Sequence, residues 1–337
     1  MSGLKHIIGA DQFIDDPGSM NEIFGYADYY KRGNRWLCSD NPLMGHVVYS
    51  VFYEPSTRTR FSFETSVHKL AGSVVSSESA ASFSSGVKGE SLKHTIRVLD
   101  SYGPFAIVLR HKEKGSAAKA VEYLPMNSLT SIINAGDGDG EHPTQALLDI
   151  YTIDRDLGGA DGKVGAIVGD LLHGRTVHSL VKMLSIYKGL KLYLVAPKII
   201  QIPDGYLSRF IAGRGNSIVR AESLAEIPAG DVDFFYQTRF QEERYEDKEI
   251  TKRVSSLKPT CRMDAKFIER VKPSAKILHP LPIDGRISQL QEVADEIDDD
   301  PRMHYIPQAG NGLVLRMGLF KYLAEGKKHG RFYPKPL

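Results

Sequence analysis

The segment SVFYEPSTRTRFSFETS, residues 50–66, places hydroxyl and guanidinium groups directly after an apolar stretch. Ser56 is a residue type that commonly caps helices, and Thr57, Arg58 and Thr59 would form a first turn whose backbone N–H groups lack helical partners. Such a turn binds phosphate through these N–H groups and the positive end of the helix dipole. A capped helix with surface arginines is the alternative. Two arginines at this end oppose the dipole unless an anion compensates, which favours an anion site.

Similar side chains follow other apolar runs of the sequence. These candidates are Arg110 after FAIVL, His142 and Gln145 in EHPTQ, Arg175 after KVGAIVGD, Arg239 and Gln241 after DVDFFYQ, and HPLP (279–282) after AKIL. Taken singly, a histidine can cap its own helix, an arginine usually forms a surface ion pair, and HPLP could be a rigid turn. Taken together, they predict a site for substrates with several negative charges.

The apolar runs alternate between strand-like and helix-like patterns. Strands are expected at 46–53, 73–76, 105–110, 131–134, 163–170, 190–197, 231–237 and 275–282, and helices at 57–71, 90–102, 115–124, 143–153, 175–187 and 311–323. This alternation is typical of α/β folds with parallel sheets. Ligands of such sheets bind outside the carboxyl ends of the strands, where the candidate residues would gather.

Length and composition restrict the class of protein. A chain of 337 residues predicts two domains, and the Gly/Asp-rich stretch 156–162 is the candidate boundary. The formal charge of +2 gives no reason to expect nucleic acid as a partner. The two cysteines, Cys38 and Cys261, predict no disulfide framework, and no apolar run approaches the roughly 20 residues that span a bilayer. With no signal peptide recognised, a cytoplasmic location is expected.

Several motifs together resemble the aspartate branch of the carbamoyltransferase family. They are STRTR (56–60), SxxxKGE (84–90), HPTQ (142–145), GRTVHS (174–179), TRxQxER (238–244), HPLP (279–282) and AGNG (309–312). STRTR marks the family as a whole. HPLP and TRxQ indicate the aspartate branch, because ornithine enzymes typically carry HCLP.

The resemblance implies two Rossmann-like lobes, with the active site in the cleft between them. It places a carbamoyl-phosphate-binding domain at 1–141, a connecting helix at 142–158 and an aspartate-binding domain at 159–304. A C-terminal helix within 305–337 would return to the first domain.

The resemblance also implies a reaction and its residues. The family transfers a carbamoyl group from carbamoyl phosphate to the amine of L-aspartate, in pyrimidine synthesis, through a tetrahedral intermediate and without metal or organic cofactor. Carbamoyl phosphate would contact Ser56, Thr57, Arg58, Thr59, Ser84, Lys88, Arg110, His142, Gln145, Pro280 and Leu281. Aspartate would contact Lys88, Arg175, Arg239 and Gln241. Catalysis itself would depend on Arg58, Thr59, Lys88, Arg110 and His142.

Ser84 and Lys88 would reach the active site of a neighbouring subunit, so the resemblance implies a homotrimer with shared sites. It leaves open whether regulatory chains bind. Two departures from the family pattern concern basic residues. Ile283 follows HPLP where bacterial members usually have arginine, and Val87 stands where some members have a second lysine.

Three alternatives remain at this stage. Transfer to ornithine or a related amino acid would need an acidic or neutral pocket, whereas Arg239 and Gln241 suit carboxylates. A catalytically silent anion-binding relative would be expected to lack part of the set Lys88, Arg110 and His142. A dinucleotide-dependent oxidoreductase is the weakest alternative, because no GxGxxG follows a strand.

Overall fold

The computed structural model describes residues 3–33, 40–78, 90–138, 140–212, 214–245, 247–285 and 291–332. The chain divides into two compact units. Unit 1 comprises Met1–Leu148 and Gly310–Leu337, and unit 2 comprises Asp149–Ala309. The division falls inside two helices, α7 (Pro143–Asp156) and α12 (Tyr305–Lys328), so each of these helices contributes residues to both units.

Unit 1 is built on a parallel sheet. Its described strands are β1 (Val47–Phe52), β2 (Ser73–Glu78), β3 (Ala106–His111) and β4 (Ser131–Asp137), in the order β2-β1-β3-β4. Every residue of β3 and β4 is buried. Buried strands of a parallel sheet read as continuous apolar runs, which explains why the sequence identified them.

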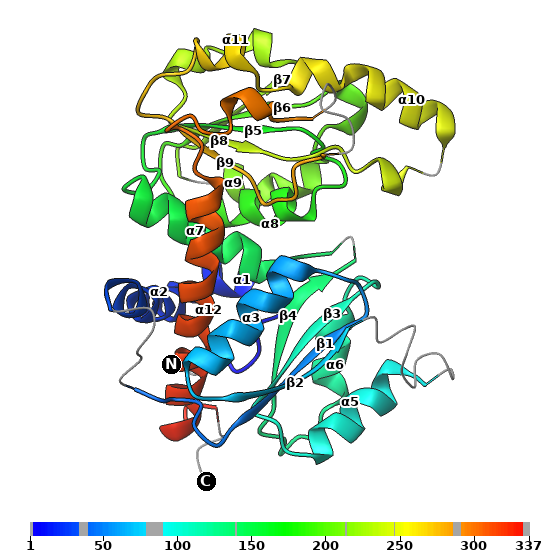
Figure 1. Cartoon of the computed structure of the whole chain (residues 1–337), viewed down its shortest axis with the longest axis vertical. Helices are drawn as coiled ribbons and strands as arrows, with labels where there is room; N and C mark the ends of the chain where they lie inside the picture. Colours follow the sequence, from blue (N-terminus) through cyan, green and yellow to red (C-terminus); the bar gives the residue numbers. More distant parts are fainter. Residues whose placement is uncertain are drawn as a thin grey trace. The chain divides into compact units, whose positions relative to one another are not determined.

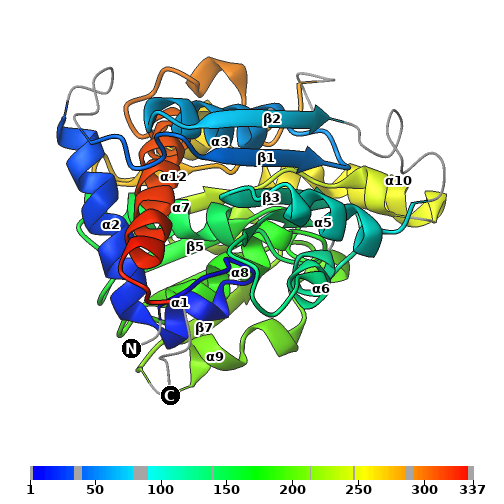
Figure 2. The ribbon, with the colours of Figure 1, turned by 90° about the horizontal axis from the view of Figure 1, so that it is seen from below.

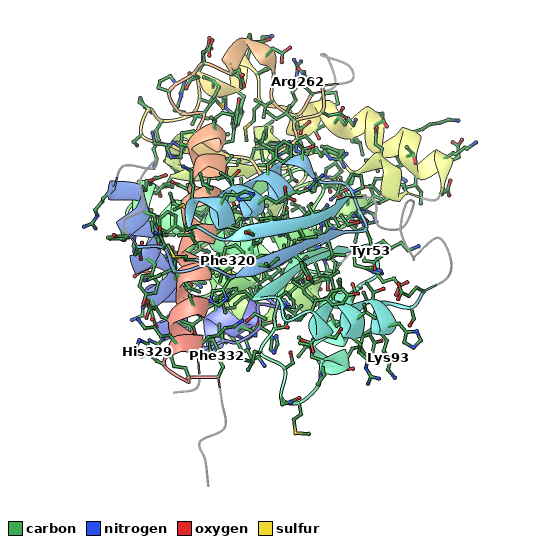
Figure 3. All side chains as sticks on the ribbon, turned by 60° about the horizontal axis from the view of Figure 1, so that its bottom comes forward. Tyr53, Lys93, Arg262, Phe320, His329 and Phe332 are labelled. Carbon is green, nitrogen blue, oxygen red and sulfur yellow. The ribbon has the colours of Figure 1, made fainter. Side chains whose placement is uncertain are left out.

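Helices α1 (Asp11–Asp15), α2 (Pro17–Arg32), α3 (Thr57–Lys69), α5 (Leu92–Ser101) and α6 (Ser116–Tyr123) complete unit 1. Helix α3 packs on β1 and β2, and α6 packs on β3 and β4 beside α5 (Figure 2). Helix α12 lies beside α2 (Figure 1), and a Cβ at Gly318 would stand 2.6 Å from the carbonyl oxygen of Ile23. Phe320 of α12, labelled in Figure 3, packs edge-on against Phe63 of α3, with 6.1 Å between the ring centroids.

Unit 2 contains a second parallel sheet. Its described strands are β5 (Val164–Val168), β6 (Lys191–Val195), β7 (Ser217–Ala221), β8 (Phe234–Gln237) and β9 (Lys276–Leu278), in the order β7-β6-β5-β8-β9. The accompanying helices are α8 (Arg175–Leu184), α9 (Ser208–Ile211), α10 (Lys248–Leu257) and α11 (Ala265–Ile268). Both sheets confirm the predicted α/β class with parallel strands.

Some elements of this fold differ from those predicted. Strand β7 is short, lies at the sheet edge and is largely exposed, so it lacks the apolar pattern of the central strands. Helix α12 begins at Tyr305, six residues before the predicted start at 311, because polar residues in its first turns hide the helical period. None of the described helices combines the length and apolarity needed to cross a bilayer.

Candidate active site

Strand order creates a candidate ligand site in unit 1. From β1 the chain crosses to β2 on one side, whereas β3 pairs with the other side of β1. The connections after β1 and β3 therefore diverge, and such a switch point is where open α/β sheets bind ligands. Phe52 lies opposite Arg110, and the N–H of Tyr53 donates to the Arg110 carbonyl at 2.8 Å. Tyr53 marks this end of β1 in Figure 3.

The STRTR segment lies at this switch point. Ser56 is the N-cap of α3, with φ −162° and ψ 94°, and Thr57 is the first helical residue, as predicted. Considering the described residues alone, the Ser56 side chain makes no capping hydrogen bond. Thr59 is buried, whereas Thr57 and Arg58 are exposed. The first turn thus combines exposed cationic and hydroxyl groups with helix N–H groups, which is the chemistry of a phosphate site.

Arg60 has a different role from its neighbour Arg58. Its Nε lies 2.8 Å from Glu64 Oε1 and donates to Ser76 Oγ at 3.1 Å. The Ser76 hydroxyl in turn donates to Glu64 at 2.6 Å. The charge that Arg60 brings to the positive end of α3 is therefore balanced by a carboxylate of the same helix. The prediction that both arginines oppose the dipole unless an anion compensates was therefore wrong for Arg60.

Arg110 and His142 lie against the same glycine. Arg110 is buried, its Nη1 donates to the Ala135 carbonyl at 3.0 Å, and its Nη2 lies 3.8 Å from a Glu54 carboxylate oxygen. Gly136 has φ +120°, and a Cβ there would stand 2.8 Å from Arg110 Nη1 and 3.6 Å from His142 Cδ2. The structure thus brings together two of the predicted catalytic side chains, and it requires a residue without a side chain between them.

His142 precedes α7 and does not belong to it. The helix begins at Pro143, one residue after the start of the connecting helix predicted at 142–158. His142 is buried, and its Nδ1 is 3.5 Å from the Thr144 hydroxyl. Gln145 is half-buried in the first turn, and its N–H donates to the His142 carbonyl at 2.9 Å. His142 and Gln145 therefore both lie at the N-terminal end of α7.

Unit 2 has its own switch point, between β5 and β8. Arg175 is the first residue of α8, which follows β5, and Arg239 and Gln241 follow β8. All three are half-buried. The two connections touch, because a Cβ at Gly169, which has φ +119°, would collide with the Thr238 carbonyl oxygen. Two arginines and an amide therefore emerge from neighbouring strands at the carboxyl edge of this sheet.

Gln241 is held by groups from both connections. Its backbone N–H donates to Asp170 Oδ2 at 3.2 Å, and its Nε2 donates to the His173 carbonyl at 2.9 Å. Arg244 Nε donates to Gln241 Oε1 at 2.9 Å. These bonds use only one of the two N–H donors of the Gln241 amide, and they fix the orientation in which the amide would meet a ligand.

A buried carboxylate, which no sequence motif indicated, lies under this loop. Asp170 is fully buried, accepts from the Tyr245 hydroxyl at 2.7 Å and lies 3.6 Å from His173 Nδ1. Burial would raise the pKa of Asp170, but His173 and the Tyr245 hydrogen bond outweigh it and hold that pKa below its usual value. Asp170 correspondingly raises the pKa of His173. The pair fixes the loop that leads to Arg175.

The HPLP segment follows β9 at the same edge of the unit 2 sheet. Pro280 and Leu281 are half-buried, and Leu281 has φ +55° with a cis peptide bond to Pro282. The N–H of Leu281 donates to His279 Nδ1 at 2.7 Å. Ile283 is half-buried and occupies the position where arginine was expected. Ser84, Val87 and Lys88 lie outside the described residues.

Comparison with known proteins identifies the family. Residues 5–155 match the carbamoyl-phosphate-binding domain of the aspartate/ornithine carbamoyltransferases, and residues 161–323 match their aspartate/ornithine-binding domain. The chain belongs to the aspartate/ornithine carbamoyltransferase family. The resemblance inferred from the motifs is confirmed.

Individual carbamoyltransferases match nearly the whole chain. The chloroplastic aspartate carbamoyltransferase of Oryza sativa is 39% identical over 329 residues, covering 96% of this chain and 86% of the rice protein. The catalytic subunit of Methanocaldococcus jannaschii aspartate carbamoyltransferase is also 39% identical, over 96% of this chain and 98% of its own length.

Solved carbamoyltransferase structures match the fold as well. The catalytic subunit of the M. jannaschii enzyme has a TM-score of 0.81 at 38% identity, covering 96% of this chain and 99% of that one. Trypanosoma cruzi aspartate transcarbamoylase, in complex with carbamoyl phosphate and aspartate, has a TM-score of 0.82 at 34% identity, covering 94% of each chain.

Proposed function

We propose that this protein is an aspartate carbamoyltransferase of pyrimidine synthesis. It transfers the carbamoyl group of carbamoyl phosphate to the amine of L-aspartate and releases N-carbamoyl-L-aspartate and phosphate. One observation carries the choice of acceptor: Arg239 and Gln241 follow β8 at the switch point of unit 2, beside the connection that leads to Arg175. Two guanidinium groups suit the two carboxylates of aspartate.

The donor half of the reaction is assigned to unit 1. Ser56, Thr57, Arg58 and Thr59 bind the phosphate with the N-terminal N–H groups of α3. Arg110 contacts both the phosphate and the carbamoyl oxygen, and His142 and Thr59 donate to that oxygen. The shared contact of Arg110 and His142 with Gly136 supports this assignment, because both donors then serve one small group.

The transition state explains why these groups are needed. Attack of the aspartate amine on the carbamoyl carbon builds negative charge on the carbamoyl oxygen in a tetrahedral intermediate. Preorganised donors at such an oxygen are worth ~3 kcal/mol each. The intermediate then expels phosphate, which can accept the proton of the attacking amine. Alignment of the two bound substrates removes much of the entropic barrier, so no covalent enzyme intermediate is needed.

The remaining contacts are assigned to the carbamoyl amino group and to the acceptor. The amino group donates to the side-chain oxygen of Gln145 and to the backbone carbonyls of Pro280 and Leu281. Aspartate binds Arg175, Arg239 and Gln241. The bonds to His173 and Arg244 orient the Gln241 amide, whose second N–H donates to a substrate carboxylate.

The assembly is proposed to be a homotrimer with shared active sites. Ser84 and Lys88 of one subunit complete the carbamoyl-phosphate site of the next, and Lys88 also contacts aspartate. The family resemblance alone supports this part of the proposal. Binding of regulatory chains is left as a question for sedimentation of the purified protein with and without candidate partners. A cytoplasmic location stays a prediction that imaging of a tagged chain can test.

The function is tested by phosphate release from carbamoyl phosphate with either L-aspartate or L-ornithine as acceptor. We expect turnover with L-aspartate and only the background rate with L-ornithine, since Arg239 repels a cationic side-chain amine. Turnover with ornithine alone would contradict the assignment. Phosphate release that neither acceptor stimulates would instead favour the silent anion-binding relative.

A further inference from the structure

A buried histidine holds the peptide between Pro280 and Leu281. His279 is 2% exposed, and its Nδ1 accepts the N–H of Leu281 at 2.7 Å. Since Nδ1 acts as the acceptor, the ring proton is on Nε2. Nε2 lies 3.0 Å from Oε1 of Glu292, which is 4% exposed, and it donates to that carboxylate. The two hydrogen bonds together fix the orientation and the tautomer of the ring.

The hydrogen bond from the Leu281 N–H to His279 also sets the direction of the Pro280 carbonyl, because the two groups belong to one peptide unit. Carbonyl and N–H groups of a planar trans peptide point in opposite directions. Because the Leu281 N–H points to the His279 ring, the Pro280 carbonyl oxygen points away from it. Leu281 also has φ +55°, a conformation that costs leucine free energy and persists only where the surroundings impose it.

The supports of His279 extend further into unit 2. The His279 backbone N–H donates to Oε1 of Gln308 at 2.9 Å, and Gln308 Nε2 donates to Asp149 at 2.6 Å. On the other side, Glu292 accepts the N–H of Asp284 at 3.3 Å. His279, Gln308, Asp149 and Glu292 are all buried. A buried polar chain of this kind is costly to build, and it rigidifies the segment that it holds.

We propose that His279 is a positioning residue for the carbamoyl group, with Glu292 fixing its tautomer. It holds the Leu281 N–H so that the Pro280 carbonyl is presented as an acceptor to the NH₂ group of the substrate. The inference rests on the proposed function, because it takes the amide of carbamoyl phosphate as the ligand. It assigns a role to the first residue of HPLP, which does not itself contact substrate.

The test compares two ligands that differ in the group to be recognised. Phosphonoacetamide carries the carbamoyl NH₂ and a non-hydrolysable phosphonate, whereas inorganic phosphate lacks the amide. Titration calorimetry on the full chain gives the ratio of their dissociation constants. A positioning role for His279 affects this ratio, whereas a general loss of folded protein lowers the binding of both ligands together.

Two variants separate the two ring nitrogens. In His279→Asn combined with Glu292→Gln, the asparagine oxygen takes the place of Nδ1 and can accept the Leu281 N–H. In His279→Gln, the amide nitrogen takes the place of Nε2 and keeps the Glu292 bond, but Leu281 loses its acceptor. We expect the double variant to bind phosphonoacetamide within a few-fold of the wild type. His279→Gln should bind it at least about tenfold more weakly, with phosphate affinity unchanged.

Asp264→Ala is the matched control, since it removes the N-cap of α11 in the same unit without touching His279 or its buried chain. It should lower the melting temperature and leave the ligand ratio unchanged. The positioning role would be overturned if both His279 variants lost phosphonoacetamide affinity equally. It would also be overturned if neither variant lost affinity. A wild-type protein that does not prefer phosphonoacetamide to phosphate would instead overturn the proposed function, so the two failures are distinguishable.

Discussion

Gly136 lies against Arg110 and His142, and its backbone conformation leaves room for both side chains. Its φ of +120° is rarely adopted by other residues, and any Cβ would press on Arg110 Nη1. We expect Gly136→Ala to displace the Arg110 guanidinium and to lower kcat by about 100-fold, because small misplacements of catalytic groups have effects of this size. Steady-state kinetics with carbamoyl phosphate and L-aspartate measures the loss.

Gly103→Ala is the control for this prediction. Gly103 also has a positive φ, +67°, but its added Cβ would meet no atom within 4 Å. Backbone strain alone should therefore lower its melting temperature while kcat stays near the wild-type value. Similar kcat losses in the two variants would show that strain, and not displacement of Arg110, explains the effect.

Individual side chains differ in how far the sequence revealed their roles. The pairing of Arg60 with Glu64 was accessible, since the two stand four residues apart on one helix, and it should have been considered. The contact of Asp170 with Tyr245 was not accessible, because it joins residues 75 positions apart through the connections after β5 and β8. The His279–Glu292 bond likewise depends on how the chain returns after β9. Local patterns carry no information about such pairs.

At the scale of elements, the N-terminus of α3 offers a test that separates capping from ligand binding. An N-cap serine whose side chain caps the helix loses about 1 kcal/mol of stability on mutation to alanine. The described contacts of Ser56 include no capping hydrogen bond, so Ser56→Ala should leave the melting temperature nearly unchanged. Carbamoyl phosphate affinity should fall several-fold, because one donor to the phosphate is lost. Thermal melts and calorimetry measure the two effects.

Asp264→Ala is the control for Ser56→Ala, because it removes a side chain that does cap its helix. The Asp264 side chain caps α11 by accepting the Phe267 N–H at 2.9 Å, and it lies on a different unit from Ser56. This variant should melt at a lower temperature and keep its affinity for carbamoyl phosphate. Ser56→Ala would contradict the proposed phosphate site if it behaved in the same way.

Most strands were predictable from the sequence, and β7 was not. Strands such as β3 are buried along their whole length, so a continuous apolar run reveals them. The edge strand β7 is largely exposed to solvent, and its sequence has no continuous apolar run. The site residues were located through the ends of these predictable strands, which is why the chemistry could be proposed before the fold was known. The order of strands, and hence each switch point, came from the structure.

At the scale of the whole molecule, the remaining prediction concerns shared active sites. If Lys88 completes the site of a neighbouring subunit, then Lys88→Ala and His142→Ala damage different halves of a composite site. Each variant alone should have little activity. In a mixed trimer, some sites combine an intact Lys88 from one subunit with an intact His142 from the next, so activity should return.

The experiment dissociates and reassembles the two variants together at equal concentration. Random mixing would restore about a quarter of the wild-type activity, since half of the subunits carry an intact His142 and half of their neighbours carry an intact Lys88. Each variant reassembled alone is the control for refolding losses. Mixed samples that stay as inactive as the separate variants, despite forming trimers in sedimentation, would place Lys88 in the same subunit's site as His142. The same sedimentation runs test the trimer itself, because a monomeric active enzyme would exclude sharing altogether.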